Sequence, residues 1–233
     1  MAIESSEHKI DPAKRLRIAY YGGSFDPVHR GHLAIGVALR DQFRLDQFVF
    51  VPAFHAPHKK RTRPTSAFDR YAMLCLSTAS TTGISVSKIE IQAPERPYTV
   101  ETLGQLKSEG PDDEIFFVMG ADSWADITTW KEWETVLSLT NHIVVTRPGF
   151  ELRSPHVTDD VRARVVDLRG EDPASLATAG HAAADSRIFL TDVANLDISA
   201  TAIRQKIREH DISWHKDVPK AVANYIEKYQ IYT

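Results

Sequence analysis

The chain has 233 residues, with 28 Lys and Arg against 31 Asp and Glu, and a formal net charge of -3 at pH 7. Because no long basic stripe interleaved with aromatic residues is present, a general nucleic-acid binder is excluded. The single cysteine, Cys75, excludes a disulfide within the chain. Neither a run of about 18 apolar residues nor an apolar N-terminal h-region occurs, so we expect a cytoplasmic protein without a membrane span.

Strand and helix patterns alternate along the chain and predict an α/β protein. The expected strands are 16–21, 47–51, 85–91, 114–119, 142–146 and 187–191. The expected helices are 31–43, 67–80, 99–109, 131–139, 200–210 and 219–229. This alternation predicts a Rossmann-like, doubly wound, mostly parallel sheet with helices on both faces, in a single domain over 15–233.

Two segments do not follow this alternation. Residues 1–14 lack periodicity and precede the first strand, so we expect a flexible leader. Residues 150–186 are polar and Ala-rich, and Pro155 and Pro173 interrupt them, with one short helical pattern near 161–168. We expect these residues to form a peripheral insertion or a mobile loop.

The turn between the first strand and the first helix carries the most informative motif, Gly22-Gly-Ser-Phe-Asp-Pro-Val-His-Arg-Gly-His32. Open α/β sheets bind ligands at such a turn. Gly22 and Gly23 let a polyphosphate approach backbone amides that favour anions. His29 and His32 share a helix face and can donate hydrogen bonds to phosphate oxygens. The alternatives are an ordinary turn, a helix cap, or a zinc site, for which the chain has neither a second cysteine nor an H-E-x-x-H pair.

A second anion site is expected near residue 200. Ser199 directly precedes the periodic run 200–210 and is a candidate N-cap, while Arg204 stands in the second turn of that helix. A guanidinium offers a planar fork of donors that suits phosphate oxygens. The alternative is an ordinary cap followed by a solvated arginine.

Residues 23–32 and 198–204 resemble two signatures of the nucleotidyltransferase superfamily, G-x-F-D-P-x-H-x-G-H and I-S-x-T-x-I-R. The blocks 96–99, 118–123, 129–133 and 146–149 are similar to those of the bacterial nicotinate-nucleotide adenylyltransferases. This resemblance covers nearly the whole chain. It implies transfer of AMP from ATP to nicotinate mononucleotide, which gives nicotinate adenine dinucleotide (deamido-NAD) and pyrophosphate in NAD biosynthesis.

The resemblance also implies which residues form the site. It assigns catalysis to His29, His32 and Arg204. It assigns ATP binding to Gly22, Gly23, Ser24, Phe25, His29, His32, Lys59, Gly120, Asp122, Ile198, Ser199 and Arg204. It assigns binding of the mononucleotide to Tyr98, Thr99, Trp130 and Arg147.

Several of these assignments have an ordinary structural alternative. Trp130 could stack on a pyridine ring or pack in the core. Lys59 belongs to a basic loop that is similar to the P-P-H-K loop of the family, with Ala56 in place of its first proline, but such a charge run is also typical of a solvated surface. Arg147 follows an expected strand, where a phosphate or carboxylate partner would fit.

In phosphoryl transfer the protein mainly positions the reactants and stabilises charge. Mg²⁺ would bridge the phosphates of ATP and keep mostly water ligands, so we expect no metal site built from side chains. The expected partners are ATP and nicotinate mononucleotide. We expect no binding to nucleic acid or to a membrane, and a homo-oligomer is possible. The alternatives are a cytidylyltransferase, a pantetheine-phosphate or nicotinamide-mononucleotide adenylyltransferase, and a nucleotide-sensing binding module.

Overall fold

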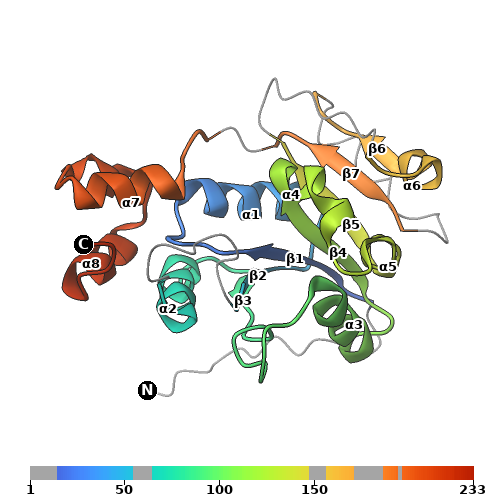
Figure 1. Cartoon of the computed structure of the whole chain (residues 1–233), viewed down its shortest axis with the longest axis horizontal. Coiled ribbons are helices and arrows are strands. Elements are labelled where there is room, and N and C mark those ends of the chain that lie inside the picture. Colours follow the sequence, from blue (N-terminus) through green and yellow to red (C-terminus); the bar gives the residue numbers. More distant parts are fainter. Residues whose placement is uncertain (1–14, 55–64, 147–155, 171–185, 194–195) are drawn as a thin grey trace, which may run out of the picture.

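The computed structural model describes residues 15–54, 65–146, 156–170, 186–193 and 196–233. Over these ranges one seven-stranded sheet has the order β3-β2-β1-β4-β5-β7-β6, and all of its strand pairs are parallel (Figure 1). The strands are β1 (Arg17–Gly23), β2 (Gln47–Pro52), β3 (Ile84–Val86), β4 (Glu114–Gly120), β5 (Asn141–Val145), β6 (Val165–Asp167) and β7 (Ile188–Thr191). The order changes direction between β1 and β4, so the carboxyl ends of these two strands lie at the switch point, where open α/β sheets bind ligands.

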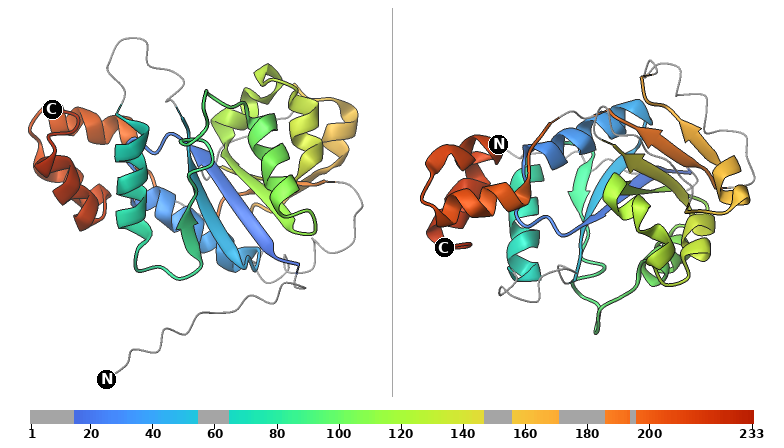
Figure 2. Two further views of the ribbon diagram at one scale, coloured as in Figure 1. Left: turned by 90° about the horizontal axis from the view of Figure 1, so that it is seen from below. Right: turned by 45° about the horizontal axis from the view of Figure 1, so that its top comes forward.

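Helices cover both faces of this sheet. They are α1 (Arg30–Gln42), α2 (Ala67–Thr78), α3 (Thr99–Glu109), α4 (Ala121–Ala125), α5 (Trp133–Leu139), α6 (Asp159–Ala163), α7 (Ala200–Arg208) and α8 (Lys220–Lys228), with short 3₁₀ helices η1 (Ile127–Thr129) and η3 (Ile212–Asp217). Figure 2 shows α1 on the face opposite to α3 and α5. This arrangement confirms the predicted doubly wound α/β fold.

The residues of β4 alternate between two hydrophobic clusters, one on each face of the sheet. Phe116 and Val118 pack with residues of α1, α7 and α8, whereas Ile115 and Phe117 pack with residues of α3 and α5. Side chains of a strand point to opposite faces in turn, and a strand that is covered on both faces is apolar throughout. The run Glu114–Gly120 therefore forms a central strand.

Several predicted boundaries differ from the structure. The strand expected over 85–91 is confined to Ile84–Val86, because the Ser87 hydroxyl accepts a hydrogen bond from the Ile89 N–H and turns the chain. The helix expected from 131 begins at Trp133, since Glu132 takes the left-handed conformation with φ 51°. The helical pattern near 161–168 is wrong beyond residue 163, where β6 pairs with β7 at the edge of the sheet. Residues 1–14 and most of 150–186 lie outside the described residues.

Within the described ranges, no helix has both the length and the apolar character that a membrane crossing requires.

Candidate nucleotide site at the carboxyl ends of β1 and β4

The glycine motif forms a tight turn, which we call the phosphate turn (residues 22–29), between β1 and α1. Phe25 takes the left-handed conformation with φ 46°, and its buried ring meets the rings of Tyr21 and Phe50 edge-on, each at a centroid distance of 5.3 Å. A Cβ at position 23 would lie 2.9 Å from Phe25 Cζ, a distance at which real Cβ atoms clash. Glycine at this position is therefore required by the packing of the turn itself.

Two histidines stand together where the phosphate turn enters α1. His29 is the buried N-cap residue of this helix, and its imidazole stacks on that of His32 with a centroid distance of 3.6 Å. The His29 backbone N–H donates to His32 Nδ1 at 3.3 Å. Because Nδ1 accepts this bond, a neutral His32 carries its proton on Nε2.

The charge state of His32 follows from its surroundings. Burial, and secondly the charge of His29, lower the pKa of His32 well below the ordinary value for histidine. At neutral pH His32 is therefore an uncharged hydrogen-bond donor through Nε2–H. Such a donor suits a phosphate oxygen on which negative charge develops.

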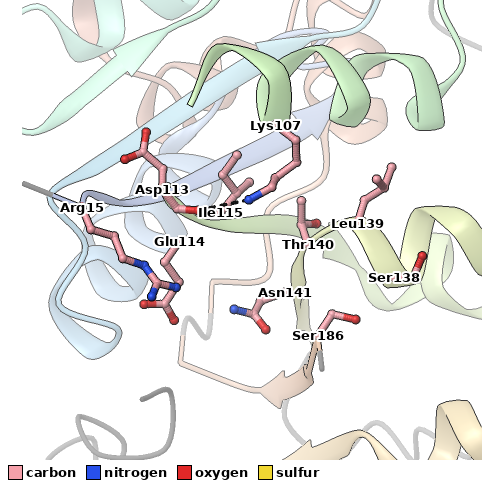
Figure 3. A pocket seen from close by; sticks show the side chains of 10 residues that line it. All are labelled: Arg15, Lys107, Asp113, Glu114, Ile115, Ser138, Leu139, Thr140, Asn141 and Ser186. Carbon is pink, nitrogen blue, oxygen red and sulfur yellow. Dashed lines mark hydrogen bonds between the residues drawn. The ribbon is translucent and has the colours of Figure 1, made fainter. Parts of the chain in front are cut away.

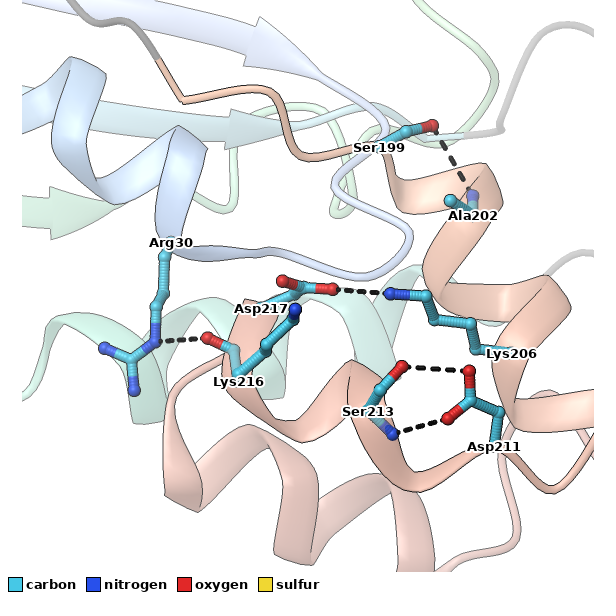
Figure 4. Close-up of polar contacts among 8 residues, drawn as sticks. All are labelled: Arg30, Ser199, Ala202, Lys206, Asp211, Ser213, Lys216 and Asp217. Atoms are coloured by element: carbon cyan, nitrogen blue, oxygen red, sulfur yellow. Dashed lines mark hydrogen bonds and ion pairs between the residues drawn. The ribbon is translucent and has the colours of Figure 1, made fainter.

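Helix α7 brings the second predicted anion site to the same turn. Ser199 Oγ accepts a hydrogen bond from the Ala202 N–H at 3.5 Å, as expected of an N-cap (Figure 4). Arg204 donates from Nη1 to the Asp26 carbonyl, across 178 residues of sequence, and from Nη2 to Thr201 Oγ1 at 2.9 Å. A guanidinium carries more N–H donors than these two bonds use, so Arg204 can hold the turn and still meet an anion.

The carboxyl end of β4 forms the neighbouring border of the site. Strand β4 ends at Gly120, and the exposed Asp122 stands in the first turn of α4 directly after it. A Cβ added to Gly120 would meet no atom within 4 Å, so the backbone here faces open space. Ile198, directly before Ser199, packs against the hydrophobic cluster that includes residues of α1, α7 and α8.

Three of the four residues predicted to bind the mononucleotide, Tyr98, Thr99 and Trp130, lie in a separate part of the surface, which we call the α3 wall (residues 98–101, 130 and 131). Tyr98 is the N-cap residue of α3, and its N–H donates to Glu101 Oε2 at 2.8 Å, with Thr99 as the first residue of the helix. Lys131 Nζ pairs with Glu101 Oε1 at 2.9 Å and lies 4.4 Å from the centroid of the Tyr98 ring. These contacts bring the Tyr98–Thr99 block and the Trp130–Lys131 block together.

Phe117 lies beneath both parts of the site. Its ring meets the half-buried Trp130 edge-on, with a centroid distance of 6.4 Å, and meets His142 at 6.0 Å. On the other side, a Cβ at Gly22 would lie 3.0 Å from Phe117 Cζ. Phe117 thus lies beside the first residue of the phosphate turn and the aromatic residue of the α3 wall.

Two predicted site residues, Lys59 and Arg147, lie outside the described residues. Their roles stay predictions.

Sequence reasoning missed Arg70 and Tyr232. Arg70 is 1% exposed, and its Nη1 donates to the Ser24 carbonyl at 2.6 Å while Nη2 donates to the Ala53 carbonyl. The sequence holds one signal for this residue, because Arg70 falls on the apolar face of α2 with Met73 and Leu74. The Tyr232 hydroxyl donates to Asp26 Oδ1 at 2.7 Å.

A cavity of about 160 Å³ lies at the other end of the strands (Figure 3). It is lined at the amino ends of β4 and β5 by Arg15, Lys107, Asp113, Glu114, Ile115, Ser138, Leu139, Thr140, Asn141 and Ser186. The carboxyl ends, with the phosphate turn, are at the opposite edge of the parallel sheet, so this cavity is separate from the candidate nucleotide site.

The Cytidylyltransferase-like family model matches residues 20–206. This range begins in β1 and ends in α7, so it includes the phosphate turn and the helix of Arg204 that contacts it. A match over most of the chain, on a doubly wound parallel sheet, places the protein in the class of nucleotidyltransferases.

Curated relatives identify the family within this class. A "Probable nicotinate-nucleotide adenylyltransferase" of Corynebacterium jeikeium (strain K411) is 35% identical over 211 residues, which is 91% of this chain and 98% of the relative. Another, of Geobacter sp. (strain M21), is 37% identical over 223 residues, which is 93% of this chain and 98% of the relative. The chain therefore belongs to the bacterial nicotinate-nucleotide adenylyltransferase family.

A solved structure shares the fold. The Plasmodium falciparum nicotinic acid mononucleotide adenylyltransferase complexed with NaAD aligns with a TM-score of 0.67 and 19% sequence identity, over 94% of this chain and 98% of that chain. At this level of identity the likeness shows the fold of the sheet and its helices.

Proposed function

We propose that this enzyme transfers AMP from ATP to nicotinate mononucleotide and releases pyrophosphate, forming deamido-NAD in NAD biosynthesis. The observation that carries the proposal is the contact between Arg204 and Asp26, which brings the two nucleotidyltransferase signatures together at the end of β1. The names of the curated relatives supply the acceptor. A separate wall with an aromatic side chain, Trp130, offers a surface for its pyridine ring.

In this reaction a phosphate oxygen of the mononucleotide attacks the α-phosphorus of ATP in line. The new P–O bond forms as the bond to the bridging oxygen of the β-phosphate breaks, and that oxygen leaves with pyrophosphate. The nucleophile is already anionic at neutral pH, so no side chain needs to remove a proton. Catalysis then depends on position and on charge stabilisation.

We assign each part of the phosphate turn a role on this basis. His29 and the uncharged His32 would donate to oxygens of the α- and β-phosphates, where charge grows. Backbone amides from Gly22 to Phe25 would hold further phosphate oxygens. Arg204 and the Ser199 hydroxyl would meet the outer phosphates, and Lys59 joins this set as a prediction.

Mg²⁺ would accompany ATP. Among the residues that the structure describes, no three His, Cys, Asp or Glu side chains converge as a metal site. In this proposal the ion would be held mainly by phosphates and water, with the exposed Asp122, directly after β4, as a carboxylate for its water shell. When bound, the ion would neutralise charge on the phosphates.

The mononucleotide would occupy the α3 wall. Trp130 would stack on the pyridine ring, and the backbone around Tyr98 and Thr99 would face its carboxylate at the start of α3, where helix amides favour anions. Arg147 is proposed as a further contact. The cytoplasmic location and any homo-oligomer stay predictions from the sequence.

Pyrophosphate release from the purified protein with ATP and Mg²⁺ tests the proposal. Nicotinate mononucleotide, nicotinamide mononucleotide and phosphopantetheine would be compared as acceptors, with the His32→Ala variant as the control for contaminating activity. We expect the highest kcat/KM with nicotinate mononucleotide. Turnover only with another acceptor would overturn the assignment of the α3 wall, and tight ATP binding without turnover would overturn the enzyme assignment.

A further inference from the structure

Asp26, in the phosphate turn, is a carboxylate in a buried position. Asp26 is 3% exposed, and a buried carboxylate requires hydrogen-bond donors. Tyr232 supplies one, since its hydroxyl donates to Asp26 Oδ1 at 2.7 Å across 206 residues of sequence. A bond between a hydroxyl and an ionised carboxylate is stronger than one between neutral groups.

Other contacts fix Tyr232 in place. The segment 229–233 follows α8, and Ile231 and Tyr232 pack against the hydrophobic cluster that includes α1, α7 and α8. The Ile231 N–H donates to the Ile226 carbonyl at 3.0 Å. Burial, and secondly the charge of Asp26, raise the pKa of Tyr232, so the phenol stays protonated and remains a donor at every working pH.

The C-terminal helices are joined to the start of α1 by a further bond. Arg30 Nε donates to the Lys216 carbonyl of η3 at 2.9 Å, and Lys206 Nζ of α7 pairs with Asp217 Oδ2 at 3.2 Å (Figure 4). Arg204 of α7 holds the main chain of Asp26, and Tyr232 holds its side chain. Asp26 is therefore held by two elements that are distant from it in the sequence, α7 and the segment 229–233.

We propose that Tyr232 is a positioning residue: through its bond to Asp26 it holds the phosphate turn in the shape that presents His29 and His32 to the phosphates of ATP. This role rests on the proposed function. Asp26 stands three residues before His29 in the same turn, so a shift of its carboxylate moves the start of α1. The α3 wall shares no described contact with Tyr232, so binding of the mononucleotide should not depend on it.

The test compares two tyrosines of the same region that each donate to an aspartate. Tyr232→Phe removes the donor to Asp26, whereas the matched control Tyr225→Phe removes a hydroxyl that donates to Asp69 Oδ1 of α2 at 2.9 Å. We expect Tyr232→Phe to lower kcat about tenfold. The KM for the mononucleotide should stay within about twofold, and Tyr225→Phe should keep the wild-type kcat. Thermal unfolding of both variants measures the purely structural cost.

A second measurement does not need turnover. The imidazole ¹⁵N resonances of His29 and His32 report the geometry and the tautomer of the pair. The chemical shifts of these resonances should change in Tyr232→Phe and should be unchanged in Tyr225→Phe. If the wild-type enzyme released no pyrophosphate, the proposed function would fail, while these resonances would still decide the role of Tyr232.

Either of two results would overturn the role of Tyr232. The first is a Tyr232→Phe protein that is less stable but keeps its kcat and both histidine resonances. The second is an equal loss of kcat in Tyr225→Phe, which would make the effect a general property of the C-terminal helices. If Tyr232→Phe does not fold, Asp26→Asn, which keeps an acceptor but removes the charge, gives the same comparison with a smaller expected loss of kcat.

Discussion

The two sides of the site are held in different ways. Contacts that span 46, 178 and 206 residues of sequence fix the phosphate turn, and they come from α2, α7 and the segment after α8. The α3 wall is held by contacts that span 3 and 30 residues, and Tyr98 at its edge is 53% exposed. The phosphate turn is therefore fixed by the overall fold, whereas the α3 wall is a local surface. We expect substitutions on the first side to change kcat and those on the second to change KM.

The largest effect is expected from His32. His32→Ala should lower kcat by about 100-fold, because it removes the Nε2–H donor while leaving the phosphate turn tied by Arg70, Arg204 and Tyr232. Steady-state kinetics with both substrates measure this, and circular dichroism checks the fold. His210→Ala, at an exposed position after α7, is the matched control. A near-normal kcat would remove His32 from catalysis.

The opposite pattern is expected at Trp130. Trp130→Ala should raise the KM for the mononucleotide by roughly tenfold, as lost stacking on a ring predicts, with a smaller change in the KM for ATP. Trp130→Phe keeps an aromatic face and should recover most of the affinity. Equal changes in both KM values would contradict the separation of the two walls.

A third effect concerns the strand beneath the α3 wall. His142 of β5 is fully buried, with Nδ1 bonded to the Thr140 carbonyl at 3.0 Å, and burial lowers its pKa from 6.5 to about 3. In the unfolded chain His142 binds a proton below about pH 6.5, whereas in the folded chain it does so only near pH 3. Between these two pH values protonation favours the unfolded chain, so the free energy of unfolding falls as the pH falls. The loss is roughly 1.4 kcal/mol for each pH unit.

Urea unfolding at several pH values between 4 and 7 measures this dependence. In His142→Asn, whose amide can still donate to the Thr140 carbonyl, the slope of the unfolding free energy against pH should become smaller. An unchanged slope would show that other groups cause the loss of stability.

The smallest effect is expected from Lys131. Its ion pair with Glu101 is exposed, and such pairs contribute little. Lys131→Met should therefore change kcat by less than about twofold and the KM for the mononucleotide by less than about threefold. A loss of affinity as large as that of Trp130→Ala would mean that the ammonium contacts the substrate.

The sequence predicts well those features that depend on residues close together along the chain. The apolar runs before residues 22 and 120 locate the two strands of the switch point, and the glycine motif and Ser199 locate the starts of α1 and α7. The anion-binding role of these two segments stays a prediction. Arg70 and Tyr232 were missed because their partners are 46 and 206 residues away, and no local period connects them. Strand β6 was missed because three residues at the edge of a sheet are too short to show an alternation.

Phe117 connects the two sides that are otherwise held apart. A Cβ at Gly22 would lie 3.0 Å from the end of its ring, and the same ring meets the indole of Trp130 edge-on. A methyl group added at position 22 would therefore require this ring to move by a few tenths of an ångström, and Trp130 is one of its neighbours in the packed core. Under the proposed assignment of the two sides, a substitution at residue 22 would then also weaken binding of the pyridine ring, and the bare backbone at this residue would keep recognition of the two substrates independent.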